Sequence, residues 1–233
     1  VLDNEPIFSE VELKILAWAS DYYHHPVGEV LGSFLPTNLR NIKTVMDDKD
    51  SVAKVEIENN PFQKNLTLQQ TEAVKTLSEL RGFAPTLLYG VTGSGKTEVY
   101  IRCIQEQLLQ QKSVLLLAPE IALTPQLEQR VKDQFGPAVG MYHSKMTPAK
   151  RYKAWKQFRS GEINILIGTR SAAMMSAPRL GLIIIDEEHD ASYKQQDPAP
   201  RYQARDTAIY YANQLGAKVV LGSATPSIET YYN

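Results

Sequence analysis

The hydrophobic positions near the start of the chain follow the period of an amphipathic helix. They cover residues 10–23, directly after a capping box that begins at Ser9. A second short helix is predicted after Pro26, and Pro36 ends it. Residues 1–36 are too few to form a core of their own. We expect them to be either the end of a larger domain or a pad against the main body.

The pattern then changes twice. Residues 37–64 combine Asn, Asp and Lys with a weak alternation at 52–57, and we interpret them as a linker. From residue 65 to 233, helical periods alternate with short apolar runs. The predicted helices cover 68–80, 96–111, 124–134, 147–159 and 202–214. The predicted strands cover 86–89, 113–117, 138–142, 163–167, 182–185 and 218–221. This alternation predicts an α/β domain whose parallel sheet is covered on both faces.

Composition narrows the possible functions. The chain has 233 residues, of which 43% are hydrophobic, enough for one good core. Its formal net charge is −1, so any contact with nucleic acid must come from a local patch. Cys103 is the only cysteine, which excludes an internal disulfide and a zinc site of several thiolates. Because no apolar run approaches the ~18 residues of a membrane span and no leader is present, we expect a cytoplasmic protein without a membrane partner.

A glycine-rich segment follows the first apolar run of the larger domain. It reads Gly-Val-Thr-Gly-Ser-Gly-Lys-Thr and matches the pattern G-x-x-x-x-G-K-[ST]. The glycines allow backbone N–H groups to converge on one anion, and a helix that begins near Lys96 adds its positive dipole end. Lys96 is expected to reach the β- and γ-phosphates, and the Thr97 hydroxyl to bind Mg²⁺. We therefore predict a nucleoside triphosphate site at Gly90, Val91, Thr92, Gly93, Ser94, Gly95, Lys96 and Thr97.

A cluster of acids follows another buried strand. Asp186, Glu187, Glu188 and His189 come directly after the apolar run 182–185. In a protein with a phosphate-binding loop, Asp186 is expected to hold Mg²⁺, and Glu187 to orient and deprotonate the attacking water. His189 is a further catalytic candidate. The alternative is a polar loop that caps the next helix.

These motifs resemble those of superfamily two helicases, and longer strings are most similar to the family of primosomal replication-restart helicases. The strings are GVTGSGKTEVY at 90–100, PEIALTPQ at 119–126, IGTRSA at 167–172, DEEHDASYKQQ at 186–196, RYQARD at 201–206 and GSATPSIET at 222–230. The resemblance implies a RecA-like P-loop NTPase lobe with a short N-terminal helical segment. Residues 1–36 then correspond to the end of an N-terminal DNA-binding region, and 65–233 to the first, ATP-binding helicase lobe.

The family also implies a function. Its members are ATP- and Mg²⁺-dependent 3′-to-5′ DNA helicases that restart stalled replication forks and load the primosome. The implied partners are single-stranded and forked DNA, single-stranded-DNA-binding protein and other primosome proteins. Zinc is expected in the full-length family, but not in this chain.

The resemblance assigns further residues. Gln70 is similar to the glutamine that reads the adenine edge, for which an amide offers both a donor and an acceptor. Residues expected to contact the backbone of single-stranded DNA are Thr124, Gln126, Thr169, Arg170 and Ser171. Residues expected to couple the ATP site to the DNA are Ser223, Ala224 and Thr225.

A loop after the acids interleaves aromatic and cationic residues. Tyr193, Lys194, Arg201 and Tyr202 resemble the family's DNA-sensing aromatic loop, in which one base stacked on one tyrosine contributes ~1–3 kcal/mol. The alternative is that the two tyrosines pin the loop to the core.

Several parts of the family pattern are not present in this sequence. The linker is too short for a whole winged-helix domain, and the cysteine-rich zinc insertion, the second helicase lobe with its arginine finger and the C-terminal domain do not occur. The chain starts at Val1 and stops at Asn233 directly after a motif, so we expect a fragment. Two other classes stay open: a P-loop kinase acting on a small molecule, and a non-catalytic module that docks on DNA or protein.

Overall fold

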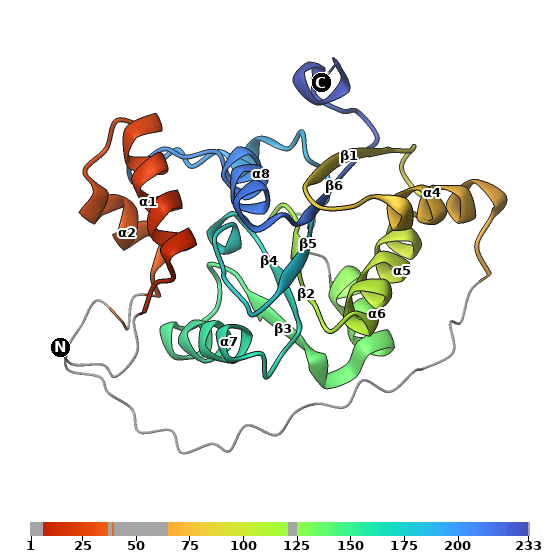
Figure 1. The fold of residues 1–233 in the computed structure, drawn as a ribbon, viewed down its shortest axis with the longest axis horizontal. Coiled ribbons are helices and arrows are strands. Elements are labelled where there is room, and N and C mark those ends of the chain that lie inside the picture. Colours follow the sequence, from red (N-terminus) through yellow and green to blue (C-terminus); the bar gives the residue numbers. More distant parts are fainter. Residues whose placement is uncertain (1–6, 37–38, 40–64, 121–124, 233) are drawn as a thin grey trace.

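The computed structural model describes residues 7–36, 39, 65–120 and 125–232 (Figure 1). Within these ranges the strands form a parallel sheet in the order β1-β6-β5-β2-β4-β3. The strands are β1 (Ala84–Tyr89), β2 (Ser113–Leu117), β3 (Val139–Tyr142), β4 (Ile165–Gly168), β5 (Leu180–Ile185) and β6 (Lys218–Ser223). The α/β fold with a parallel sheet, predicted from the alternation of segments, is confirmed.

Helices cover both faces of the sheet (Figure 1). One face packs against α4 (Leu68–Glu79), α5 (Lys96–Leu109) and α6 (Pro125–Phe135), and the other against α7 (Pro148–Ser160) and α8 (Ala204–Leu215). The short helix α9 (Ile228–Tyr232) follows β6, and single 3₁₀ turns lie at Gly136–Ala138, Arg170–Ala172 and Ala191–Tyr193. No helix in the described part of the chain is long and apolar enough to cross a membrane.

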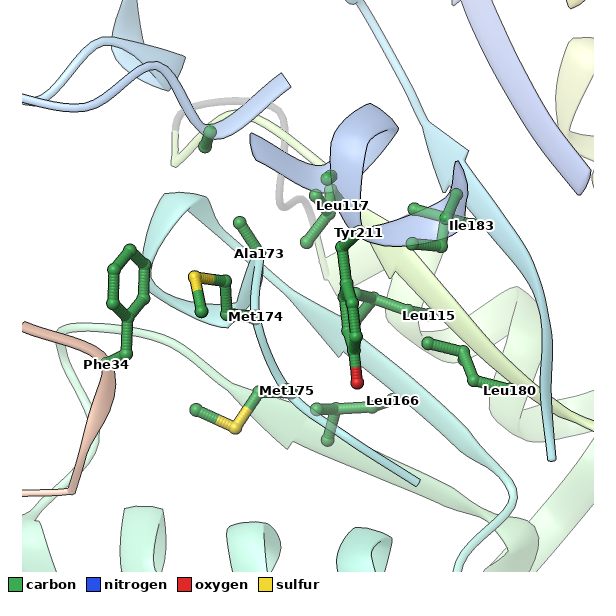
Figure 2. Packing of buried hydrophobic residues seen from close by; sticks show 14 of the residues in the cluster. Phe34, Leu115, Leu117, Leu166, Ala173, Met174, Met175, Leu180, Ile183 and Tyr211 are labelled. Carbon is green, nitrogen blue, oxygen red and sulfur yellow. The ribbon is translucent and has the colours of Figure 1, made fainter. Parts of the chain in front are cut away.

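The central strands supply both halves of the core. Ile183 and Ile185 of β5 belong to the cluster on the α8 side, whereas Leu182 and Ile184 belong to the cluster on the α5 side. This alternation is the two-residue period of a strand that is buried on both faces. Figure 2 shows part of the first cluster, to which Ile183 and Tyr211 of α8 both belong.

The first two helices, α1 (Glu10–Tyr22) and α2 (Val27–Phe34), share this core. Ile15 and Phe34 are buried in the same cluster as Tyr211. The Trp18 ring stacks on Tyr210 of α8, with 4.1 Å between the ring centroids and 12° between the planes. In the described residues, α1 and α2 therefore pack against the main body.

Parallel strands bring their carboxyl ends to one edge of the sheet, and the motifs follow those ends. Residues 90–97 follow β1, 186–189 follow β5, and 169–171 follow β4, while Ser223 ends β6 and residues 224–225 follow it. In sheets of this kind, ligands bind outside the carboxyl ends of the strands. The topology therefore gathers the predicted site at one place, although its residues are far apart in the sequence.

Candidate active site

The glycine-rich segment 90–97 forms a tight turn between β1 and α5. Gly93 and Gly95 have φ angles of 80° and 82°, in the left-handed region that favours glycine. The Lys96 ammonium donates a hydrogen bond of 2.9 Å to the carbonyl oxygen of Gly90, so its charge lies inside the turn. Because α5 begins at Lys96, the positive end of its dipole lies at the same place.

The space around this turn fits a nucleotide. A Cβ atom on Gly90 would lie 2.8 Å from the Ser94 hydroxyl oxygen, so a side chain there would require the Ser94 side chain to shift. A cavity of about 330 Å³ adjoins the turn and is lined by Lys96, by Val99 and, from α4, by Ala73. A larger hollow of about 650 Å³ lies beside α8 and α9, but no residue of the glycine-rich turn lines it, so the smaller cavity is the candidate nucleotide site.

The two predicted catalytic acids lie beside this turn. Glu187 Oε1 is 3.9 Å from Lys96 Nζ, which brings together motifs that are far apart in the sequence. The Tyr100 hydroxyl donates a hydrogen bond of 2.8 Å to Asp186 Oδ1 and fixes that carboxyl group. Burial raises the pKa of Asp186 above its ordinary value, and the hydrogen bond from Tyr100 opposes this rise. A divalent cation at Asp186 would stabilise the ionised form.

The third acid, Glu188, has a structural role that the sequence analysis did not assign. Its side chain is buried and accepts hydrogen bonds from Arg205 Nη1 at 2.9 Å, from the Ser227 backbone N–H at 2.8 Å and from the Thr230 hydroxyl at 2.8 Å. Burial opposes its ionisation, but these hydrogen bonds and the charge of Arg205 outweigh burial and hold the pKa of Glu188 below its ordinary value. Glu188 thereby joins the end of β5 to α8 and α9.

His189 connects the acid motif to the segment after β6. Its Nδ1 lies 2.8 Å from the Ser223 hydroxyl oxygen, and its Nε2 lies 3.2 Å from the Thr225 hydroxyl oxygen. The Ser223 hydroxyl oxygen also accepts from the Thr225 backbone N–H at 3.0 Å. The structure thus brings His189 together with two of the three predicted coupling residues, while Ala224 lies between them in the chain.

Gln70 lies at the nucleotide cavity, but its amide is engaged within the protein. Its carbonyl oxygen accepts from the Thr67 backbone N–H at 2.9 Å, and its NH₂ group donates to the Ser94 carbonyl oxygen at 2.9 Å. The position agrees with a contact to the nucleotide. In this arrangement, however, Gln70 supports the phosphate-binding turn, and reading an adenine edge would require it to exchange these hydrogen bonds.

The expectation that Tyr193 and Tyr202 stack on bases is wrong for this structure. The two residues are 0% and 2% exposed. The Tyr193 hydroxyl donates to the Asp186 carbonyl oxygen at 2.6 Å, and the Tyr202 ring packs on Phe34 with 5.0 Å between centroids. Because both rings fill core positions, neither presents a face to a base. The alternative, in which the tyrosines pin the loop to the core, describes what is observed.

The cations of the same loop have different surroundings. Arg201 is exposed, and Lys194 Nζ lies 5.6 Å from the centre of the Tyr23 ring. Arg170 donates from Nη1 to the carbonyl oxygens of Ser192 and Lys194 at 3.3 and 3.1 Å, so it holds the loop instead of extending into solvent. Of the predicted DNA-contacting cations, Arg201 is exposed and Lys194 half-buried, whereas Arg170 is engaged within the protein.

The remaining predicted DNA contacts lie at the same edge of the sheet, with one exception. Thr169 is 1% exposed, and its hydroxyl oxygen and that of Ser171 are buried without a hydrogen-bond partner in the described residues. Gln126 is exposed in the first turn of α6. Thr124 lies outside the described residues.

The donor set is compatible with Mg²⁺. Among residues 7–36, 39, 65–120 and 125–232, no group of three or more His, Cys, Asp and Glu side chains could hold a metal ion. Mg²⁺ commonly keeps several waters and binds through one or two protein groups together with substrate phosphates. The Thr97 hydroxyl and the Asp186 carboxylate fit that kind of site.

Comparison with known proteins agrees with this geometry. A family model described as DEAD/DEAH box helicase matches residues 67–233, and a model described as 3′ DNA-binding domain matches residues 1–36. The chain belongs to the DEAD/DEAH box helicase family.

Within that family, the chain is similar to proteins named replication restart protein PriA. It is 40% identical to that of Helicobacter pylori strain J99 over 231 residues, which cover 99% of this chain and 35% of the relative. It is 36% identical to that of Haemophilus influenzae over 303 residues, with 100% of this chain and 41% of the relative covered. The resemblance to replication-restart helicases is thereby confirmed, and the chain spans 35% to 41% of the length of these relatives.

Solved structures show the same fold at low sequence identity. The Pyrococcus furiosus Hef helicase domain superposes with a TM-score of 0.51 at 22% identity and covers 71% of this chain and 34% of that chain. The UvsW helicase from bacteriophage T4 has a TM-score of 0.50 at 18% identity and covers 73% and 57% of the two chains. These likenesses confirm the helicase-lobe fold.

Proposed function

We propose that this chain is the first, ATP-binding lobe of an ATP-dependent 3′-to-5′ DNA helicase that restarts stalled replication forks and loads the primosome. The observation that carries the proposal is the meeting of Lys96 and Glu187, 3.9 Å apart, beside a cavity of nucleotide size. The names and identities of the relatives support the replication-restart role. Neither a small-molecule kinase nor a non-catalytic docking module is favoured.

The proposed organisation follows the sequence. Residues 1–36 are the end of an N-terminal DNA-binding region, 37–64 are a linker, and 65–233 are the helicase lobe. The match of residues 1–36 to a 3′ DNA-binding domain supports the first boundary. Although α1 and α2 pack on the lobe, this contact is compatible with a DNA-binding region that sits against its motor.

The chain would hold the nucleotide with residues 90–97, and Mg²⁺ with Thr97 and Asp186. Mg²⁺ bound to ATP neutralises charge that develops on the phosphates. Lys96 contributes a second positive charge from a fixed position, and the backbone N–H groups of the turn contribute hydrogen bonds. Glu187 is placed to accept the proton of the attacking water. His189 lies between Glu187 and the coupling residues Ser223 and Thr225.

DNA would cross the carboxyl edge of the sheet. The proposed contacts are Thr124, Gln126, Thr169, Arg170, Ser171, Lys194 and Arg201. Arg170 would act mainly by holding the loop that contains Lys194. A cytoplasmic location and contacts with single-stranded-DNA-binding protein and other primosome proteins are part of the same proposal.

ATP hydrolysis by the full-length protein, with and without forked DNA, tests this proposal. Lys96→Ala should abolish turnover without loss of fold, because the lysine neutralises phosphate charge instead of packing the core. Glu187→Gln should bind ATP normally and hydrolyse it ~10²–10⁴-fold more slowly, because the amide cannot accept the proton. Lys75→Ala, at an exposed position on α4, is the control. Turnover near the wild-type rate in both site variants would exclude the proposed active site.

A further inference from the structure

Helix α7 differs from the rest of the chain in its charge. Its sequence, PAKRYKAWKQFRS, contains no Asp or Glu. The formal net charge of the whole chain is only −1, so this concentration of cations is a local feature. Its cationic residues are Lys150, Arg151, Lys153, Lys156 and Arg159.

The two arginines of α7 serve the fold. Arg151 donates to the Tyr142 hydroxyl at 3.1 Å, and its guanidinium carbon lies 4.9 Å from the centre of that ring. Arg159 forms an ion pair of 2.9 Å with Glu12 of α1 and also donates to the Ser176 hydroxyl at 2.9 Å. Both arginines are therefore explained by contacts within the protein.

The three lysines have no such explanation. Lys150, Lys153 and Lys156 are exposed, and none of them forms a salt bridge with any residue that the structure describes. With about 100° of rotation per residue, positions three apart differ by about 60° around the helix axis. The three ammonium groups therefore share one side of α7.

This arrangement is unfavourable for the helix itself. Lys150 lies in the first turn, where a positive charge opposes the helix dipole by about 0.3–1 kcal/mol. Like charges three residues apart repel each other by a further few tenths of a kcal/mol. On α6, by contrast, Lys132 pairs with Glu128 at 2.6 Å. Uncompensated like charges on one face lower the stability of a helix. Such an unfavourable arrangement is expected where the face serves a binding function.

We propose that the face of α7 formed by Lys150, Lys153 and Lys156 binds the phosphate backbone of double-stranded DNA. The aromatic residues of this helix favour a duplex over a single strand. Tyr152 and Trp155 stack on each other, with 6.0 Å between centroids, and Arg159 lies 5.5 Å from the Trp155 ring. Single-stranded DNA is usually bound with bases stacked on free aromatic rings, whereas lysine contacts to phosphates alone suit a duplex.

The location of α7 makes this a separate contact. The helix packs beside the edge strand β3, apart from α4 and the nucleotide cavity (Figure 1). The inference rests on the proposed DNA helicase function, since it supplies a second, sequence-independent contact to the same substrate. A duplex arm of a fork could lie against α7 while a single strand crosses the carboxyl edge of the sheet.

The test is the salt dependence of binding by this chain to a blunt DNA duplex and to a single-stranded oligonucleotide of the same length. The double variant Lys153→Ala/Lys156→Ala should weaken duplex binding and reduce the slope of log K against log salt by about 2, since each lost phosphate contact removes about 0.9. Binding to the single strand should be unchanged. Lys75→Ala/Lys132→Ala removes the same charge from α4 and α6 and should leave both slopes at wild-type values.

Further variants and readouts separate the alternatives. Lys153→Arg/Lys156→Arg keeps the charge and should restore the duplex slope, which a fold defect would not allow. Equal losses in the two alanine pairs, or an equal loss for the single strand, would overturn the proposal. Nucleotide binding to the wild-type chain, measured separately, reports on the proposed helicase function, so that a failure of that function is distinguished from a failure of the α7 contact.

Discussion

At the scale of single residues, Tyr193 shows how a side chain in a functional loop can belong to the core. Tyr193→Ala should lower the free energy of unfolding by about 3–5 kcal/mol, because it empties a fully buried position. Tyr193→Phe should cost only about 1 kcal/mol, the contribution of the hydrogen bond to the Asp186 carbonyl. Urea denaturation of both variants measures these losses. Unchanged stability in Tyr193→Ala together with weaker binding of single-stranded DNA would indicate instead that the Tyr193 ring stacks on a base.

Sequence reasoning at this scale worked where the chemistry is local. The glycine-rich turn and the acids after β5 are each a contiguous motif, so the residues of each could be identified from their spacing alone. The partners of those acids could not be predicted, because Tyr100 and Asp186 are 86 residues apart and meet only through the sheet order. For the same reason, the sequence could not show that both aromatic residues of the loop are buried.

At the scale of elements, Glu188 ties together β5, α8 and α9. The pKa of Glu188 is lower in the folded protein than the unperturbed value of 4.5. The ionised side chain therefore stabilises the fold at any pH above 4.5, and this contribution is lost as the pH falls through the pKa of the folded protein. Glu188→Gln should therefore cost about 1.5–3 kcal/mol at neutral pH, since it removes the charged acceptor of Arg205, which keeps its ion pair with Asp206.

The difference between wild type and Glu188→Gln should shrink as the pH falls from 4.5 through the lower pKa of the folded protein, below which the wild-type carboxylate is itself protonated. Thermal or urea unfolding of both proteins across the acidic range measures this convergence. A constant difference at all pH values would show that the ionised form of Glu188 does not contribute.

The pad formed by α1 and α2 gives a second prediction at this scale. Ile15→Ala should destabilise the whole lobe by about 2–5 kcal/mol, because Ile15 is 0% exposed in the cluster that also contains β5 and α8. Leu13→Ala, at a neighbouring position that is 52% exposed, is the matched control and should have little effect. Urea unfolding followed by circular dichroism should show one transition, and a separate early transition for α1 would indicate an independent segment.

The existence and type of the elements were predictable because the apolar periods are clear, but several ends were not. β5 begins at Leu180, earlier than the predicted Leu182, because Ser113 pairs with Leu180 across a register shift. Gly181 interrupts the apolar run, so the pattern alone hid this extension. β4 begins at Ile165 instead of Ile163, although Ile163 remains buried in the core.

At the scale of the whole molecule, the site lies at an open edge of a single lobe. The side chains of Lys96 and Glu187 are 10% and 30% exposed, and the described residues provide no second cation that faces Lys96 across the cavity. In the family that the chain resembles, an arginine from the second lobe completes this charge environment. This chain spans 35% to 41% of the length of two PriA relatives, so a longer relative provides a direct comparison.

We therefore expect this chain alone to bind nucleotide through residues 90–97 but to hydrolyse it slowly. Arginine fingers contribute about 10³–10⁵ in rate in related phosphoryl-transfer sites, so the chain should be slower than the longer protein by a factor in that range. ATP turnover by both proteins with saturating single-stranded DNA measures the difference, and nucleotide binding by the chain with Lys96→Ala as the negative control verifies that the site is formed. A robust, DNA-stimulated rate from the chain alone would show that one lobe, or two copies of it, completes the active site.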